Sequence, residues 1–188
     1  MPPDLPTDDA AWDALYAGGR SAAAAFHFTD LPTVRRVGDW LVEGLHRGQD
    51  ARFVDLGSGT GKFVLAAAAR HPEVQWWGVE LRPELHAVAE DWRARYGVAN
   101  AHFVRADLRD FRLEGFAGAY VFNPFGELLD PRPDLGTEGL GARGPAAYRE
   151  ALGALRQNLG RVGEGFRLAT YFCGEEVTGG LGCEVKMW

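Results

Sequence analysis

The chain has 188 residues, of which 46% are hydrophobic and 24% charged, and these proportions predict one soluble globular domain. The net charge is -6, whereas proteins that bind phosphate backbones normally carry an excess of Lys and Arg, so nucleic acid is a disfavoured partner. The sequence has no secretion signal and no apolar run near the ~20 residues that span a bilayer. We therefore expect a cytoplasmic protein with no membrane partner.

Two helices are predicted near the amino terminus. Residues 11–16 favour a short helix, which Gly18 and Gly19 end. Residues 31–46 predict an amphipathic helix, because apolar side chains recur there at spacings of three and four. We divide the chain into an N-terminal segment, 1–30, able to fold over a pocket as a lid, and a main domain, 31–188. Within that segment, the lid would use Phe26, His27 and Phe28.

From residue 52 onward, predicted strands alternate with predicted helices. The strands are 52–56, 74–80, 101–105, 119–122 and 166–172, and the helices are 63–70, 84–96 and 146–159. This alternation predicts an α/β fold with a Rossmann-like, doubly wound, mostly parallel sheet that helices cover on both faces. The Gly- and Pro-rich residues 130–145 predict a long loop, a candidate lid.

The last predicted strand, 183–188, raises a question of direction. Only about ten residues separate Phe172 from Cys183, and a parallel crossover needs about a dozen or more, usually including a helix. We therefore expect an antiparallel last strand beside 166–172. An exposed apolar edge there would permit a homodimer.

The most informative stretch is 53–62, FVDLGSGTGK, which follows a predicted strand and opens a predicted helix. Its three glycines let the backbone turn sharply and approach a ligand, and the helix start presents free N–H groups. A phosphate-binding P-loop would need Gly at Leu56 and Ser or Thr at Phe63, so that pattern fails. A strict dinucleotide motif would need Gly at Lys62 and also fails.

What remains, D-x-G-x-G-x-G, resembles the first motif of class I S-adenosylmethionine-dependent methyltransferases. Two more acids follow at the ends of the second and third predicted strands, Glu80 in GVEL and Asp107 in FVRAD. The resemblance implies that Asp55 lies near the methionine amino group, Glu80 binds the ribose hydroxyls and Asp107 reads the adenine amino group. The implied set of residues that bind the cofactor is Asp55, Gly57, Ser58, Gly59, Gly61, Glu80, Leu81, Asp107, Leu108 and Asn123.

The segment after the fourth predicted strand, FNPFGE, is the candidate catalytic site. It is similar to a small bacterial type of methyltransferase with F-N-P-F, and it resembles the N-P-P-aromatic motif of enzymes that methylate amino or amide nitrogen. The implied catalytic residues are Asn123, Pro124 and Phe125, which would orient the nitrogen. The sequence has one Pro fewer than that motif, so a simple strand-ending turn is an equal interpretation. Glu127 either deprotonates the acceptor or points to solvent.

The expected function is therefore in-line methyl transfer from S-adenosylmethionine to a nitrogen of a protein or small molecule. Two alternatives stay open: a non-catalytic module that binds S-adenosylmethionine, and a nucleotide-dependent oxidoreductase. No metal site is expected, because the histidines are scattered and the two cysteines, Cys173 and Cys183, are far apart in sequence. Both cysteines are expected to be free thiols.

Overall fold

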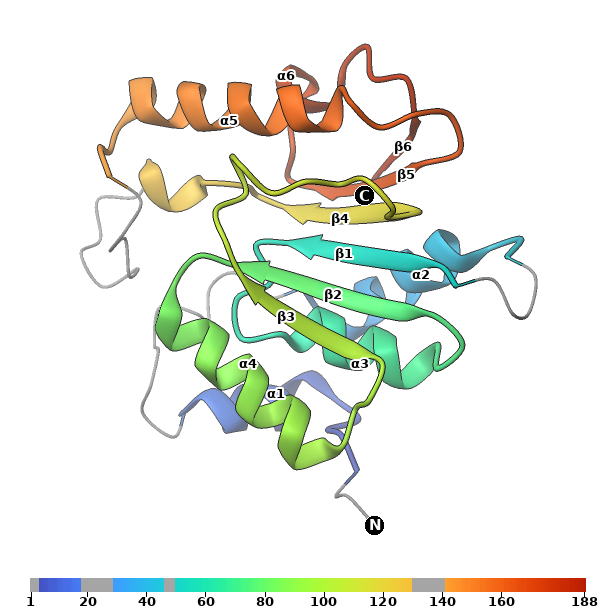
Figure 1. Ribbon diagram of the computed structural model, residues 1–188. Helices are drawn as coiled ribbons and strands as arrows, with labels where there is room; N and C mark the ends of the chain where they lie inside the picture. The colour runs from blue at the N-terminus through green and yellow to red at the C-terminus, as the bar shows by residue number, and fades with distance from the viewer. Residues whose placement is uncertain (1–3, 18–28, 46–49, 130–140) are drawn as a thin grey trace.

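The computed structural model describes residues 4–17, 29–45, 50–129 and 141–188. Its helices are α1 (Asp9–Ala17), α2 (Leu31–Val42), α3 (Lys62–Arg70), α4 (Pro83–Tyr96), α5 (Pro145–Leu159) and α6 (Glu175–Thr178), with a 3-10 turn, η2 (Gly126–Leu128). Its strands are β1 (Arg52–Leu56), β2 (Gln75–Glu80), β3 (Ala101–Arg105), β4 (Gly118–Phe122), β5 (Arg167–Tyr171) and β6 (Glu184–Met187). They form one sheet in the order β3-β2-β1-β4-β5-β6 (Figure 1).

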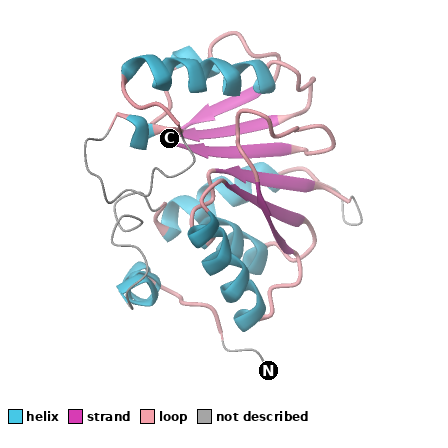
Figure 2. Ribbon diagram, turned by 60° about the vertical axis from the view of Figure 1, so that its left-hand side comes forward, coloured by secondary structure: helices cyan, strands magenta, loops and turns pink. Residues whose placement is uncertain are grey.

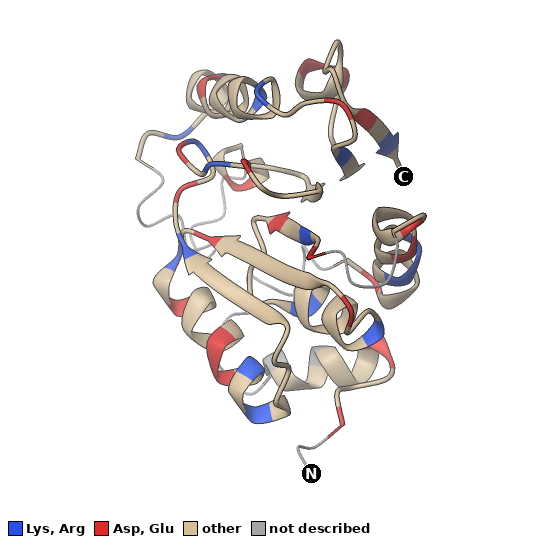
Figure 3. Ribbon diagram, turned by 45° about the vertical axis from the view of Figure 1, so that its right-hand side comes forward, with Lys and Arg blue, Asp and Glu red and all other residues tan. Residues whose placement is uncertain are grey.

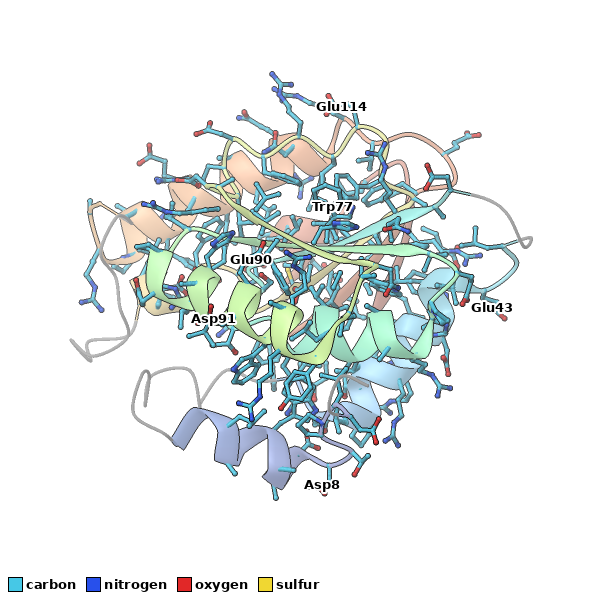
Figure 4. The ribbon with its side chains drawn as sticks, turned by 60° about the horizontal axis from the view of Figure 1, so that its bottom comes forward. Asp8, Glu43, Trp77, Glu90, Asp91 and Glu114 are labelled. Atoms are coloured by element: carbon cyan, nitrogen blue, oxygen red, sulfur yellow. The ribbon has the colours of Figure 1, made fainter. Side chains whose placement is uncertain are left out.

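Helices cover both faces of the sheet, as the alternation of elements predicted (Figure 2). Successive side chains of a strand point to opposite faces, so Phe53 joins the core beneath α1 to α4 while Val54 joins the core beneath α5 and α6. Figure 4 shows the same division: Glu90 and Asp91 lie on α4, and Trp77 lies on the other side of the sheet. The two layers bury a continuous apolar sheet, which fixes the strand ends in place.

The direction in which the chain adds strands reverses between β1 and β4. β1 to β3 are added outward on one side, and the chain then crosses back so that β4 to β6 extend the other side. In open α/β sheets, ligands bind at this switch point, beyond the carboxyl ends of the strands. The connection that crosses back, residues 106–117, contains no helix.

The prediction of an antiparallel last strand is wrong, because β6 pairs with β5 in parallel, with Arg167 opposite Glu184. β5 ends at Tyr171 and β6 begins at Glu184, so the connection is longer than the sequence suggested and includes the short helix α6. Its length reaches the dozen or so residues that a parallel crossover needs. The homodimer at this edge stays a prediction.

The other predicted elements are confirmed with small shifts at their ends. The helix predicted for 31–46 ends at Val42, and the one predicted for 11–16 extends over Asp9–Ala17. Of the predicted loop 130–145, residues 130–140 lie outside the described residues, and Pro145 already belongs to α5. Phe26, His27 and Phe28 also lie outside them. Within the described ranges, no helix has the length and apolar character needed to cross a bilayer.

Candidate cofactor and acceptor site

The glycine loop leaves β1 and turns back over β2 before α3 begins. The N–H groups of Gly57 and Ser58 both donate to the carbonyl of Val79, at 2.9 Å each. Gly57, Gly59 and Gly61 have φ angles of 96°, 55° and 87°, in the region that favours glycine. This local geometry explains why the loop needs three glycines.

Gly59 and Gly61 have different surroundings. A Cβ built on Gly61 would lie 2.6 Å from the ring of Phe103 and 3.0 Å from the Cβ of Ala89, so this glycine allows close packing of the loop on the sheet. A Cβ built on Gly59 meets nothing within 4 Å. Gly59 therefore faces open space, as a glycine that approaches a ligand should.

One pocket brings the predicted residues together at the carboxyl ends of β1 to β4. Of the residues predicted for the cofactor and the chemistry, Gly61 alone is not part of its wall. The described residues that line it are Thr29, Asp55, Leu56, Gly57, Ser58, Gly59, Lys62, Phe63, Val79, Glu80, Leu81, Arg82, Leu85, Asp107, Leu108, Tyr120, Phe122, Asn123, Pro124, Phe125 and Glu127.

Glu80 ends β2 with a buried carboxylate whose two oxygens are both engaged. Oε2 accepts a hydrogen bond from the N–H of Gly59 at 2.9 Å, which fixes the glycine loop to β2. Oε1 accepts from the N–H of Arg82 at 2.9 Å and from its Nε at 2.8 Å. A ribose that binds Glu80 must therefore share it with the Arg82 guanidinium.

Asp107 repeats this arrangement one strand further along. Its carboxylate accepts from the N–H and the Nε of Arg109, both at 2.9 Å. Burial alone would raise the pKa of Asp107, but these bonds to Arg109 hold it below its usual value. Both acids thus belong to an acid-Leu-Arg triplet, Glu80-Leu81-Arg82 and Asp107-Leu108-Arg109. The sequence contains this signal, although the expected roles did not use the two arginines.

Asp55 differs from these two acids because nothing in the described part of the chain neutralises it. Its side chain is buried and has no hydrogen-bond partner among the described residues. Burial, with the nearby charge of Glu80, raises its pKa to about 8. A ligand cation in the pocket would favour the ionised form of Asp55.

At the other end of the pocket, the turn after β4 is strained. Asn123 and Phe125 have φ angles of 39° and 60°, and Phe172, at the end of the neighbouring strand β5, has 49°. These are the non-glycine residues with positive φ in the described ranges. Such strain tends to collect at functional sites, because it persists only where the surrounding structure enforces it.

Asn123 joins two strand ends through its backbone, and its side chain lies on the turn. Its N–H donates to the carbonyl of Tyr171 at 2.9 Å, and its own carbonyl accepts from the N–H of Gly126 at 3.2 Å. The amide group packs closely over Gly126, where a Cβ would collide with it. Because the same residue also lines the pocket, its geometry is compatible with both the catalytic and the turn interpretation.

Sequence reasoning missed four polar residues in the pocket wall: Thr29, Lys62, Arg82 and Tyr120. The Tyr120 hydroxyl and Thr29 Oγ1 form a hydrogen bond of 2.8 Å, and burial raises the pKa of Tyr120 above its usual value. No local pattern joins residues so far apart in the chain. Lys62 and Arg82 are the exceptions, because Lys62 directly follows the glycine loop and Arg82 belongs to the triplet Glu80-Leu81-Arg82.

Neither of the two cysteines is suited to chemistry at this site. Both are free thiols, and burial raises the pKa of Cys173 to about 11. Within the described ranges, no three His, Cys, Asp or Glu side chains come together as metal ligands. Basic and acidic residues are interspersed over the described elements (Figure 3).

Most of the residues that line this pocket lie in a segment that resembles a known protein family. Residues 53–135, from β1 past the turn after β4, match the family model of the methyltransferase domain. This segment is therefore similar to the methyltransferase domain. The matched segment includes all the predicted site residues. It begins at Phe53, the first residue of the stretch 53–62 that contains the glycine motif.

Several curated proteins are similar to parts of this chain. A tRNA (guanine-N(7)-)-methyltransferase of Synechococcus sp. is 40% identical over 55 residues, 29% of this chain and 23% of the relative. The release factor glutamine methyltransferase of Vibrio cholerae is 34% identical over 89 residues, 46% of this chain and 31% of the relative. The matches span between 20% and 36% of the length of the curated relatives.

One solved structure is also similar to part of the chain. An RNA methyltransferase from Salinibacter ruber, crystallised with S-adenosyl-L-homocysteine, has 28% identity and a TM-score of 0.42. The alignment covers 50% of this chain and 60% of that one.

Proposed function

We propose that this protein is an enzyme that transfers the methyl group of S-adenosylmethionine to a nitrogen acceptor. One observation carries the proposal: Asp55, Glu80 and Asp107, each at or near the carboxyl end of a neighbouring strand, line one pocket around an open glycine loop. The match to the methyltransferase domain supports the reaction class.

The pocket residues fit this cofactor. The cofactor has an ammonium group at its amino-acid end, and Asp55 is a buried carboxylate that lacks a partner among the described residues. Ser58 Oγ is buried and has no hydrogen-bond partner in the described part of the chain, and no described atom lies within 4 Å of a Cβ built on Gly59. Glu80 would hold the ribose hydroxyls, and Asp107 with Leu108 would hold the adenine, as in the family that the motif resembles.

S-adenosylmethionine would supply an electrophilic methyl group on a sulfonium, which a nucleophilic acceptor would take in line with the carbon–sulfur bond, leaving S-adenosylhomocysteine. The residues of the chain therefore need to position the acceptor more than to move protons. Asn123 and the carbonyl of Pro124 accept hydrogen bonds from the nitrogen and orient its lone pair, and Phe125 packs beside it. The names of two relatives, which specify guanine N7 and glutamine, support a nitrogen acceptor.

Calorimetry with S-adenosylhomocysteine tests the proposal, and we expect binding in the micromolar range. If the protein bound NADH or ATP tightly but did not bind S-adenosylhomocysteine, the proposal would be overturned in favour of an oxidoreductase or another nucleotide-binding protein. Turnover is then measured with radiolabelled S-adenosylmethionine and a panel of proteins, small amines and tRNA. Cofactor binding with no transfer to any acceptor would favour the non-catalytic module.

A further inference from the structure

Lys62 is a buried cation in the wall of the pocket, at a place where a cation is costly. It is the first residue of α3, and its side chain is 4% exposed. The helix dipole opposes positive charge at this end, and burial of an ammonium group costs further free energy. Lys62 and Lys186 are the only lysines in the sequence, which otherwise uses arginine. This position therefore needs anions nearby.

Asp9 supplies one such anion from the amino-terminal part of the chain. The Lys62 Nζ donates to Asp9 Oδ1 at 2.6 Å, and the same carboxylate accepts from the N–H of Leu31 at 3.1 and 3.3 Å. Asp9, Leu31 and Lys62 are the first residues of α1, α2 and α3. The Asp9 carboxylate therefore joins the backbone at the start of α2 to the side chain of the first residue of α3.

The amino-acid end of the cofactor carries a carboxylate as well as an ammonium group. Asp55 suits the ammonium, and a cation in the same pocket is needed for the carboxylate. Among the described residues, the pocket wall contains two cations, and one of them, Arg82, is hydrogen-bonded to Glu80. Lys62 is the other, and it lies in the same wall as Asp55 and Gly59.

We propose that Lys62 binds the α-carboxylate of the cofactor and that its ion pair with Asp9 makes α1 a clamp over that end of the pocket. This inference rests on the proposed function. α1 lies beneath α3 and α4 (Figure 1), and Asp9 is its contact with the pocket wall. Thr29, just before α2, reaches the same pocket and bonds Tyr120. The ligand class that the clamp selects is a nucleoside that bears an α-amino acid group.

The test compares S-adenosylhomocysteine with 5′-methylthioadenosine, which lacks the amino-acid group. The wild type should bind S-adenosylhomocysteine at least about tenfold more tightly, since a charge-assisted hydrogen bond contributes that much. Lys62→Met should lower the affinity for S-adenosylhomocysteine by about 10- to 100-fold. It should leave the affinity for 5′-methylthioadenosine within about threefold of the wild-type value. Lys186→Met, which changes the only other lysine, should alter neither affinity.

The clamp has a separate readout in amide hydrogen exchange of residues 9–17. S-adenosylhomocysteine should slow this exchange in the wild type, 5′-methylthioadenosine should not, and Asp9→Asn should remove the effect. If Lys62→Met alone impairs folding by leaving the half-exposed Asp9 without its partner, the double variant Asp9→Asn/Lys62→Met removes both charges together and answers the same question.

If the Lys62 variants lost affinity for both ligands equally, the inference would be overturned, because the result would indicate that Lys62 has a structural role. Equal affinity of the wild type for both ligands would also overturn it, while leaving the proposed function intact. If the wild type bound neither ligand, the proposed function itself would fail, and the inference with it.

Discussion

The carboxylate of Glu80 raises the pKa of Asp55, which lies on the neighbouring strand of the sheet. Burial contributes more to this shift than Glu80 does. Glu80 is neutralised by Arg82 and by backbone N–H groups, whereas Asp55 has no such partner in the described part of the chain. Two adjacent acids in one pocket are therefore prepared for different tasks.

The first prediction concerns pH. The pKa of Asp55 is raised to about 8, and a bound ammonium group should lower it again, so binding releases a proton below that pH. The affinity for S-adenosylhomocysteine should therefore rise with pH, by about tenfold from pH 6 to pH 7, and level off above pH 8. Calorimetry in buffers of different ionisation enthalpy measures the proton directly.

The folding stability of the ligand-free protein should change with pH in the opposite direction to the affinity, and fall as pH rises. The folded state favours protonated Asp55, so its contribution to stability is present below the unfolded pKa near 4 and is lost as pH rises through 8. Asp55→Asn should flatten both profiles, and Asp91→Asn, an exposed change on α4, should leave them as they are. Proton-neutral binding at pH 7 would contradict this account of Asp55.

The second prediction separates backbone strain from ligand contact at Gly59. Gly59→Val should abolish binding of S-adenosylhomocysteine, since the branched side chain would enter the open space beside the loop. Gly165 also has a positive φ, 88°, and open space around it, but it lies outside the pocket. Gly165→Val should therefore lower the melting temperature about as much as Gly59→Val does, without changing the affinity for S-adenosylhomocysteine. Retained binding in Gly59→Val would remove the loop from the cofactor site.

The third prediction tests the chemistry at Asn123. Asn123→Ala should leave the affinity for S-adenosylhomocysteine within about threefold while reducing turnover by roughly thirty- to a thousand-fold, or about 2–4 kcal/mol. Asn123→Gly should reduce turnover equally but cost less stability, because glycine accepts the φ of 39°. Turnover is measured with the acceptor found in the panel. Unchanged turnover in both variants would favour the turn interpretation.

The fourth prediction concerns Asn158, a buried residue of α5 outside the pocket. Its amide donates to the carbonyls of Leu108 and Arg109, at 3.2 and 2.8 Å, and so holds the loop that carries Asp107. Asn158→Ala should cost about 2–3 kcal/mol of unfolding free energy, measured in urea, because two carbonyls lose their donor.

The same variant should also weaken adenosine binding, since the adenine side of the pocket loosens. Gln157→Ala, an exposed change on the same helix, is the matched control for both measurements. If Asn158→Ala lowered stability but left adenosine affinity unchanged, the loop would not depend on this anchor for its shape.

The sequence predicts those parts of the fold and the site that depend on local patterns. The apolar run at 52–56 coincides with β1, and the three acids are spaced so that parallel strands bring them to one edge. The glycine spacing predicted the loop correctly, and the structure gives the reason: each of the three glycines there has a positive φ, which favours glycine. It did not separate Gly59, which faces the pocket, from Gly61, which packs on Phe103.

The parts that were not predicted depend on contacts between distant residues or on very short elements. The direction of β6 depends on α6, a single helical turn too short to give a periodic signal. The bond between Asp9 and Lys62 joins residues 53 positions apart, and no spacing rule connects them. Arg82 and Arg109 follow their acids by two residues, so the sequence contains the repeated triplet, but the spacing alone does not show that each guanidinium turns back to bind its acid.

The switch between β1 and β4 has a consequence for the order of folding. Phe53 and Gly118 are register partners although they are far apart in the chain, so this pairing pays a larger loop-closure cost than β1 pairing with β2. The pocket contains residues from both sides of that pairing, Glu80 and Asp107 on one and Asn123 on the other. A bound cofactor would thus hold the two halves together, so it should act chiefly by slowing the rate at which they separate.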